Sequence, residues 1–316
     1  MTAEPSNAGH TSEGRVTQAE LDVVRRHSGQ VGWPTIVLAV VLIGIEAGVF
    51  ALWFAGVLPT AVGFLINSVV AYAWYTVHHE ATHKTISGRQ QRWRWLDPTF
   101  GQLAGIAMQL PFSGYADNHL RHHAHVNGPK DPDLLVKGPL SQVPLKWLLL
   151  IVAVTLSALP WGDEVVTALF GRIGIRFDDS EPRRSKASRH EQRRWSRVTF
   201  VILLASIPLG LFYPLLLLWW LPSRVGLLAL MVLFQWLPHF PFDRMDRFGA
   251  TRAVSFRAST WLLLQQDRHL VHHLYPSVPW YRYGAVLGEL RPFLIERGAR
   301  LQGRGTEPKA PIELRS

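Results

Sequence analysis

The chain has 316 residues, 48% of them hydrophobic, with 13 tryptophans and a formal net charge of +10. This composition argues against a soluble protein and favours one embedded in a lipid bilayer, where excess Lys and Arg belong to cytoplasmic loops rather than to a nucleic-acid site. Cysteine is absent, which excludes disulfides, thiolate metal sites and a built-in iron–sulfur centre, so any redox chemistry needs electrons from outside.

The chain is expected to divide into three parts. Residues 1 to 33 are polar and charged, and we interpret them as a cytoplasmic, partly disordered leader with one short helix around Gln18 to His27. Residues 34 to 302 are interpreted as one integral-membrane domain, and residues 303 to 316 as a loose tail.

The first two apolar runs predict a transmembrane hairpin. Thr35 to Val57 holds one charge, Glu46, and as a helix would span roughly 34 Å, which is enough to cross a bilayer. Ala61 to Val77 is apolar except for Asn67. A polar group inside a span is costly, so Asn67 is a candidate for substrate contact, although a hydrogen bond between helices explains it equally well.

Four further apolar segments follow, and not all of them can cross the membrane. They are Phe100 to Phe112, Leu145 to Trp161, Val198 to Leu221 and Val225 to Leu237. The first two are interpreted as interfacial or re-entrant because they are short. The last two are expected to be spans joined by an outside turn at LPSR, which ends in Arg224.

A basic linker orients these spans. By the positive-inside rule the linker from Gly171 to Arg197 is cytoplasmic, so the number of crossings before it is even. We therefore expect an all-α membrane protein with about four transmembrane helices, both termini inside and a histidine-rich helical cap on the cytoplasmic face. The linker's basic residues are Arg172, Arg176, Arg183, Arg184, Lys186, Arg189, Arg193, Arg194 and Arg197.

Eleven of the 14 histidines fall in four clusters, all expected on the cytoplasmic face. Residues i, i+3 and i+4 of a helix share one face, so the second and last clusters can each converge on a metal. In the first cluster His79 and His83 are about 40° apart around the helix axis, whereas His78 and His83 are about 140° apart, which favours His79 over His78. The clusters are His78, His79 and His83; His119, His122, His123 and His125; His239; and His269, His272 and His273.

Coordination that is rich in imidazole and free of thiolate suits iron, copper or zinc, and the clusters together supply enough ligands for two ions. Nearby acids would hydrogen-bond and orient the imidazoles, unless they are ordinary helix caps or solvated charges. Asn127 either supports a ligand in the same way or starts a turn. The acids are Glu80, Asp117, Asp131, Asp133, Asp243 and Asp267.

Three histidine boxes, HEATH, HLRHH and HLVHH, occur in this order, together with the segments HHAHVNGPKDPD, WLPHFPFD and HLVHHLYPSVPWYRY. In these motifs, over roughly Val69 to Leu294, the chain resembles the membrane fatty acid desaturase/hydroxylase superfamily of di-iron oxygenases, and within it the carotenoid ring hydroxylases and ketolases. Three boxes in series are highly specific, whereas each box alone is weak. The resemblance implies two non-haem irons, molecular oxygen as co-substrate, and a ferredoxin or similar electron donor.

Carried over position by position, the resemblance also implies nine iron ligands, with His78 and His125 as additional candidates. Many relatives have Asp where this chain has Glu80, and His78 with His83 gives an HxxxxH pattern typical of some acyl desaturases. The nine ligands are His79, His83, His119, His122, His123, His239, His269, His272 and His273.

The favoured function is therefore a membrane oxygenase that hydroxylates, ketolates or desaturates a lipophilic substrate, with a carotenoid-like terminal ring preferred and a fatty acyl chain as the alternative. A membrane zinc protease of the HExxH type, with Glu80 as general base, would use two histidines and leave the other nine unexplained. A metal transporter or store would need more polar residues within the spans. The basic linker is expected either to attract an acidic redox partner or only to set the topology.

Overall fold

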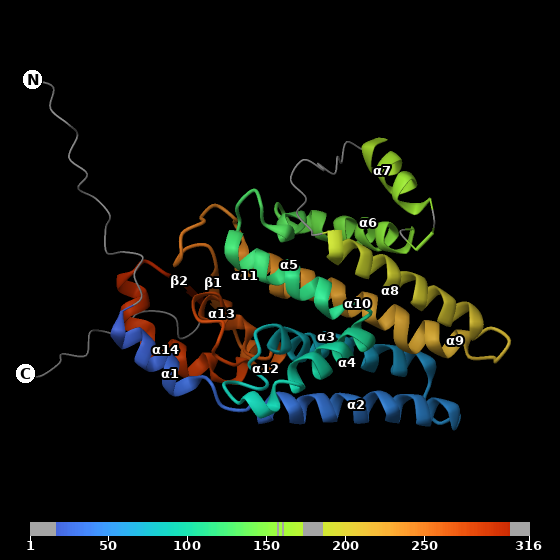
Figure 1. Ribbon diagram of the computed structural model, residues 1–316, viewed down its shortest axis with the longest axis horizontal. Helices are drawn as coiled ribbons and strands as arrows, with labels where there is room; N and C mark the ends of the chain where they lie inside the picture. The colour runs from blue at the N-terminus through green and yellow to red at the C-terminus, as the bar shows by residue number, and fades with distance from the viewer. Residues whose placement is uncertain (1–16, 157, 160, 173–185, 304–316) are drawn as a thin grey trace, which may run out of the picture.

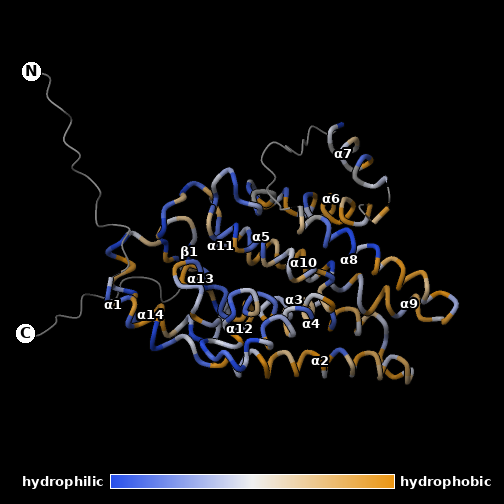
Figure 2. The backbone as a smooth tube through the Cα atoms, in the orientation of Figure 1, coloured by the Kyte–Doolittle hydropathy of each residue, from blue (hydrophilic) through white to orange (hydrophobic). Residues whose placement is uncertain are grey.

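Long helices make up most of the computed structural model, which describes residues 17–156, 158–159, 161–172 and 186–303 (Figure 1). Among these residues, three helices are long and apolar enough to cross a membrane: α2 (Trp33–Phe54), α3 (Thr60–Thr82) and a continuous helix from Phe212 to His239. Hydrophobic residues concentrate on the half of the molecule that holds α2 and α9 (Figure 2). The chain is thus a mostly helical protein with the features of a membrane protein.

The predicted hairpin at the start of the chain is present as α2 and α3. Its turn lies at Ala55 to Pro59, between the two helices. Helix α3 lies at the centre of the bundle, and its side chains Trp74 and Val77 belong to a buried core shared with α2, α4 and the long helix that ends at His239.

The segment expected to turn at LPSR is instead helical throughout. It comprises α9 (Phe212–Leu215), α10 (Leu221–Leu230) and α11 (Leu237–His239), joined by π-helical stretches at Leu216–Trp220 and Met231–Trp236. The turn lies earlier, between α8 (Lys186–Ala205) and α9. The expected spans Val198 to Leu221 and Val225 to Leu237, and the outside turn between them, are therefore wrong.

Two polar residues explain why the helix continues through LPSR. Pro222 has no backbone N–H, so the carbonyl of Leu218, four residues earlier, loses its helical partner. The amide of Asn67 donates to that carbonyl, with Nδ2 to O at 2.6 Å. Arg224, expected on the outside, is buried, and its guanidinium donates to the carbonyls of Met108 and Gln109.

Four shorter helices lie between the long hairpins: α4 (Leu96–Met108), α5 (Phe112–His125), α6 (Val143–Leu156) and α7 (Gly162–Arg172). The two segments judged too short to cross fall on α4 and α6. Helices α4 and α5 form a hairpin that turns at Gln109, which has a left-handed backbone with φ 56°. At this turn the last carbonyls of α4 have no hydrogen-bond partner within the helix, and these are the carbonyls that accept from Arg224. Short 3₁₀ turns occur at Gln91–Trp93, Pro132–Val136 and Leu140–Gln142.

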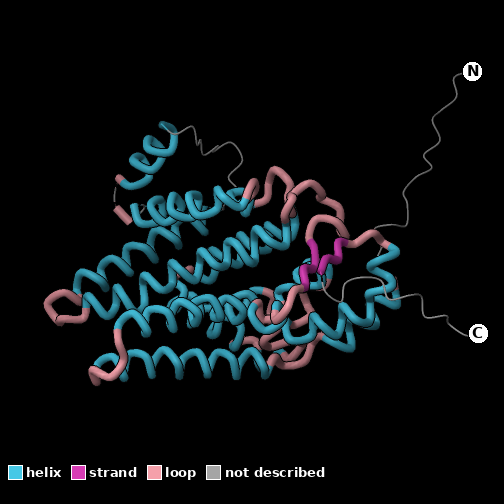
Figure 3. The backbone as a smooth tube through the Cα atoms, turned by 180° about the vertical axis from the view of Figure 1, so that it is seen from behind, coloured by secondary structure: helices cyan, strands magenta, loops and turns pink. Residues whose placement is uncertain are grey.

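The C-terminal part of the chain forms a cap on one end of the bundle. It contains α12 (Ser259–Leu262), α13 (His269–Leu274), α14 (Tyr283–Glu296) and 3₁₀ turns at Gln266–Arg268 and Trp280–Arg282. Strands β1 (Arg252–Ser255) and β2 (Arg300–Gly303) pair in parallel, so the expectation of an all-α fold is wrong in this detail (Figure 3). The long separation of the two strands in sequence left no local signal for the pairing.

The short helix predicted in the leader is confirmed as α1 (Gln18–His27). It packs on α14, and its Val23 joins the core of the cap. Arg26 and His27 both pair with Glu289 of α14. Residues 1–16 of the predicted leader and residues 304–316 of the predicted tail lie outside the described residues.

Candidate metal centre

The nine histidines predicted as ligands converge on one region at the same end of the bundle. They come from the end of α3, from α5, from α11 and from α13. Nitrogen atoms of these side chains form sets that lie within 4.8 Å of one another, as a shared metal ion requires. Helical spacing places neighbours on one face, but only the packing of four separate elements brings the boxes together.

A first group consists of His79, His83, His119 and His272. The Nε2 atoms of His79 and His272 are 3.0 Å apart. The Nε2 atom of His123 lies 2.7 Å from that of His272 and 3.1 Å from that of His119, so His123 borders this group.

A second group consists of His122, His239 and His273. His269 adjoins it, because its Nε2 atom lies 3.0 Å from that of His273. The rings of His123 and His273 stack with centroids 4.3 Å apart, and this pair joins the two groups.

Burial favours the neutral form, which binds metal, for most of these imidazoles. It lowers the pKa of His83, His119, His269, His272 and His273 well below the usual value. The Nε2 atom of His272 lies close to two other imidazole nitrogens, those of His79 and His123, while its Nδ1 lies 3.1 Å from the Tyr283 hydroxyl. A single N–H at Nε2 could be donated to only one of the two nitrogens. Converging neutral nitrogens without thiolates suit iron, copper or zinc.

Three of the predicted orienting acids do lie beside imidazoles. Asp131 Oδ1 is 2.8 Å from His122 Nδ1, and Asp133 Oδ2 is 3.8 Å from the same atom. Burial alone would lower the pKa of His122, but these carboxylates outweigh it and raise the pKa. Glu80 Oε1 lies 3.6 Å from His79 Nδ1, while its other oxygen accepts from the Thr85 hydroxyl and the Trp280 backbone N–H.

The other predicted polar partners do not contact an imidazole in this way. Asp243 is exposed and pairs with Arg300 at 2.7 Å, which ties the loop after α11 to β2. Asp267 accepts from Ser259 and Arg268 and fixes the turn before α13. The side-chain amide of Asn127 donates to the carbonyls of Arg244 and Ala250, and its backbone N–H donates to Asp131, so it acts on His122 only through that carboxylate.

Two further candidate ligands, and one remaining acid, are not members of these groups. His78 is fully buried with its ring against Phe112 and Tyr115, on the side of α3 away from His83, as the helical angle predicts. His125 is exposed at the end of α5. Asp117, also on α5, has one carboxylate oxygen without a hydrogen-bond partner among the described residues.

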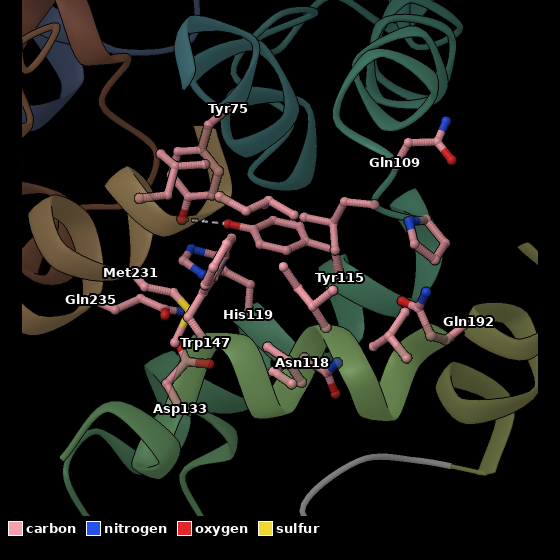
Figure 4. Close-up of a pocket in the computed structure, with 18 of the residues that line it drawn as sticks. Tyr75, Gln109, Tyr115, Asn118, His119, Asp133, Trp147, Gln192, Met231 and Gln235 are labelled. Carbon is pink, nitrogen blue, oxygen red and sulfur yellow. Dashed lines mark hydrogen bonds between the residues drawn. The ribbon is translucent and has the colours of Figure 1, made fainter. Parts of the chain in front are cut away.

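A largely apolar cavity of about 150 Å³ adjoins the first histidine group (Figure 4). Its walls come from α3, α5, α6, α8 and α10, and His119 and Asp133 lie at one end. The predicted substrate contact Asn67 does not line this cavity, since its amide is engaged with Leu218. The apolar wall includes Leu150, Ile151, Val154, Leu227 and Leu230.

Two tyrosines that the sequence analysis missed line this cavity beside His119. The Tyr115 hydroxyl donates to that of Tyr75 at 2.7 Å, as Figure 4 shows, and the Tyr115 ring stacks on His119. Each tyrosine precedes a box histidine by four residues, Tyr75 before His79 and Tyr115 before His119, and so shares its helix face. That spacing is the signal that could have found them.

The contrast between Asp131 and Asp243 gives a matched test. We expect Asp131→Asn to weaken metal retention by about 10-fold or more, because loss of a carboxylate that orients a ligating imidazole typically has this effect. Asp243→Asn, which removes the same charge from the surface, should leave retention unchanged. Metal bound per chain after dialysis against graded chelator measures both, and equal losses in the two variants would show that Asp131 has no special role.

Comparison with known proteins agrees with this geometry. The model of the family described as "Fatty acid desaturase" matches residues 51–305. The chain is 24% identical over 257 residues to the Delta(12) fatty acid desaturase of Calendula officinalis, covering 72% of this chain and 65% of that protein. It is 23% identical over 259 residues to the acyl-lipid (9+3)-(E)-desaturase of Dimorphotheca sinuata, covering 70% and 64%.

A third relative has a different printed activity. The chain is 27% identical over 255 residues to the beta-carotene ketolase of a Paracoccus species, covering 74% of this chain and 83% of the ketolase. The chain thus spans just under two thirds of the length of the two desaturases and a larger share of the ketolase. Because the family model extends over most of its length, the chain belongs to the fatty acid desaturase family.

Proposed function

We propose that this protein is a membrane-bound oxidoreductase that uses a non-haem di-iron centre, molecular oxygen and external electrons to oxidise a C–H bond of a lipophilic substrate. The observation that carries the proposal is the pair of adjoining groups of buried imidazoles beside an apolar cavity. Two irons held by the nine histidines would supply the redox chemistry. The donor set fits iron, and the family supports it over the other metals that imidazoles bind.

The chain's own residues bind and orient the substrate. The apolar wall from α6 and α10 would hold a hydrocarbon, and it keeps water away from the reacting end. Tyr75 and Tyr115, held to each other by a hydrogen bond, fix how close the substrate approaches His119. Asp131 holds His122 in one ring orientation, whereas Glu80 lies beside His79 at 3.6 Å without a hydrogen bond to it.

For the substrate we favour a carotenoid-like terminal ring over an acyl chain. The beta-carotene ketolase is matched over 83% of its length, whereas the two desaturases are matched over 65% and 64%. The motifs around His239 and the third box also resemble the carotenoid enzymes. The HxxxxH pattern of some acyl desaturases gains no support, since His78 lies away from the histidine groups.

Expression in cells that make β-carotene, with pigments and fatty acids analysed together, tests this choice. We expect ring-hydroxylated or ring-ketolated carotene and unchanged acyl lipids. New double bonds in the acyl lipids beside unaltered carotene would overturn the substrate but leave the oxygenase intact. Metal analysis of the purified protein should find two irons per chain, whereas one zinc and no iron would favour the protease hypothesis.

For the topology we propose four crossings, formed by α2, α3, α8 and the helix from Phe212 to His239, with the histidine cap in the cytoplasm. The support is that the turn after α2 and the turn after α8 lie at the same end of the molecule, away from the cap (Figure 1). Electrons from a cytoplasmic ferredoxin-like donor would then reach the cap from the aqueous side.

This topology predicts the side on which inserted reporters are found. Reporter fusions after Arg172 and after Ser316 should report cytoplasm, and a fusion after Gly210 should report the opposite side, because the basic linker favours the inside. If the fusions after Arg172 and Gly210 report the same side, α8 does not cross and the four-span arrangement fails.

A further inference from the structure

A second opening reaches the histidines from the side of the cap. It is a cleft of about 530 Å³ with His123 and His273 on its lining, between the segment 124–130 after α5 and the segment 245–251 before β1. Both loops lie at the end of the molecule away from the turns of the long hairpins (Figure 1). The histidines are therefore approached from two directions, through the apolar cavity beside His119 and through this cleft.

The two histidines in the cleft occupy a special place between the groups. Their stacked rings join the first group, through the contact of His123 with His272, to the second group, to which His273 belongs. Both are half-buried, as is His83, whereas His79, His119, His122, His239, His269 and His272 are buried. An electron that enters at this stacked pair is adjacent to both groups.

The rim of the cleft has the composition of a transient protein interface. Met245, 69% exposed, supplies an apolar contact of the kind enriched where proteins bind. Lys130 and Arg247 line the rim with one acid, Asp246; Asp246 pairs with Arg244, and Arg247 lies 3.5 Å from Glu20. The rim is held in shape because Asn127 donates to the carbonyls of Arg244 and Ala250 and so links the two loops.

We propose that this cleft is where the electron donor docks, and that the donor is a small one-electron carrier protein with an acidic surface. The inference rests on the proposed oxygenase function. Hydroxylation of R–H consumes one O₂, two electrons and two protons and yields R–OH and water. Two reduced carriers would be oxidised in turn to supply the electrons, solvent would supply the protons, and a chain without cysteine holds no thiol or iron–sulfur relay of its own.

The cleft carries this role better than the basic linker, which was expected either to attract an acidic redox partner or only to set the topology. Of the linker residues, Arg176, Arg183 and Arg184 lie outside the described residues. Arg194 and Arg197 lie exposed on α8, and α8 contributes no residue to the cleft. Charge on the linker can attract a carrier from a distance, but electron transfer requires close approach to the metal centre.

The test compares two double variants of the full-length, iron-loaded protein in detergent. Lys130→Glu with Met245→Glu alters the rim, and Arg183→Glu with Arg184→Glu is the linker control, which changes more charge. The probe is a purified plant-type two-iron ferredoxin, an acidic carrier, and its Kd is measured by thermophoresis. The rim variant should raise the Kd about 5- to 20-fold, the range that loss of two interface contacts gives, and the linker variant by less than about twofold at moderate salt.

A change of less than threefold in the rim variant, or a loss in the linker variant at least as large as in the rim variant, would overturn the docking site. Iron per chain and the thermal unfolding midpoint are measured for each variant, so that damage to the fold is not mistaken for lost docking. Since binding is read directly, failure of the oxygenase function would show separately, as absent iron or absent product in the wild-type protein.

Discussion

His79→Ala is expected to abolish iron binding and activity, whereas His78→Ala, one residue earlier, should leave the iron content unchanged. His79 lies in the first histidine group, 3.0 Å from His272, so its loss removes a ligand from a buried site. Iron affinity should fall by more than about 100-fold, beyond the range given by loss of an orienting partner. Iron per chain by elemental analysis, after purification from iron-replete cells, gives the result without an activity assay.

His78 is the matched control because it is also fully buried and lies on the same helix. Its ring packs on Phe112 and Tyr115, so His78→Ala opens a cavity and should lower the thermal unfolding midpoint while two irons remain. A second control, His190→Ala, changes an exposed residue of α8 and should have neither effect. Iron loss in His78→Ala with retention in His79→Ala would reverse the assignment and restore the HxxxxH pattern.

Arg224→Met is expected to cost the largest amount of stability of any single change outside the histidine groups, about 2–5 kcal/mol. Arg224 is buried halfway along the helix from Phe212 to His239 and donates to the carbonyls of Met108 and Gln109. Met has similar length but no donor, so both carbonyls at the end of α4 would lose their partner in an interior without water. The free energy of unfolding, measured by denaturant titration in detergent, gives the cost.

Arg194→Met makes the same substitution at an exposed position on α8 and should change stability by less than about 0.5 kcal/mol. Arg224→Lys keeps the charge but not the planar donor group that reaches two carbonyls, so an intermediate loss is expected. If Arg224→Met were as stable as the wild type, the guanidinium would not be what holds the α4–α5 turn against the long helix.

Part of the arrangement of the histidines could be predicted because helical spacing is a local rule. Spacing within a helix decides which imidazoles share a face, and it separated His79 from His78 without any knowledge of the fold. The same argument, applied to Tyr75 and Tyr115, would have found the two tyrosines beside the cavity. The partners of the acids could not be found in this way, since Asp131 reaches His122 and Asp243 reaches Arg300 only through the folding of loops.

The sequence by itself determined the membrane character, the first hairpin, the short helix α1 and the set of histidines, because composition, periodicity and helical spacing act over a few turns of chain. Only the tertiary structure decided that Phe212 to His239 is one helix. A proline followed by a charged residue predicts a turn when only the helix's own backbone can supply hydrogen-bond partners. Here the Asn67 amide of α3 donates to the carbonyl of Leu218, which lacks a helical partner, and the carbonyl of Met108 at the end of α4 accepts from Arg224. The pairing of β1 with β2 and the cleft at His123 and His273 likewise depend on segments far apart in the chain, whose contact no local pattern records.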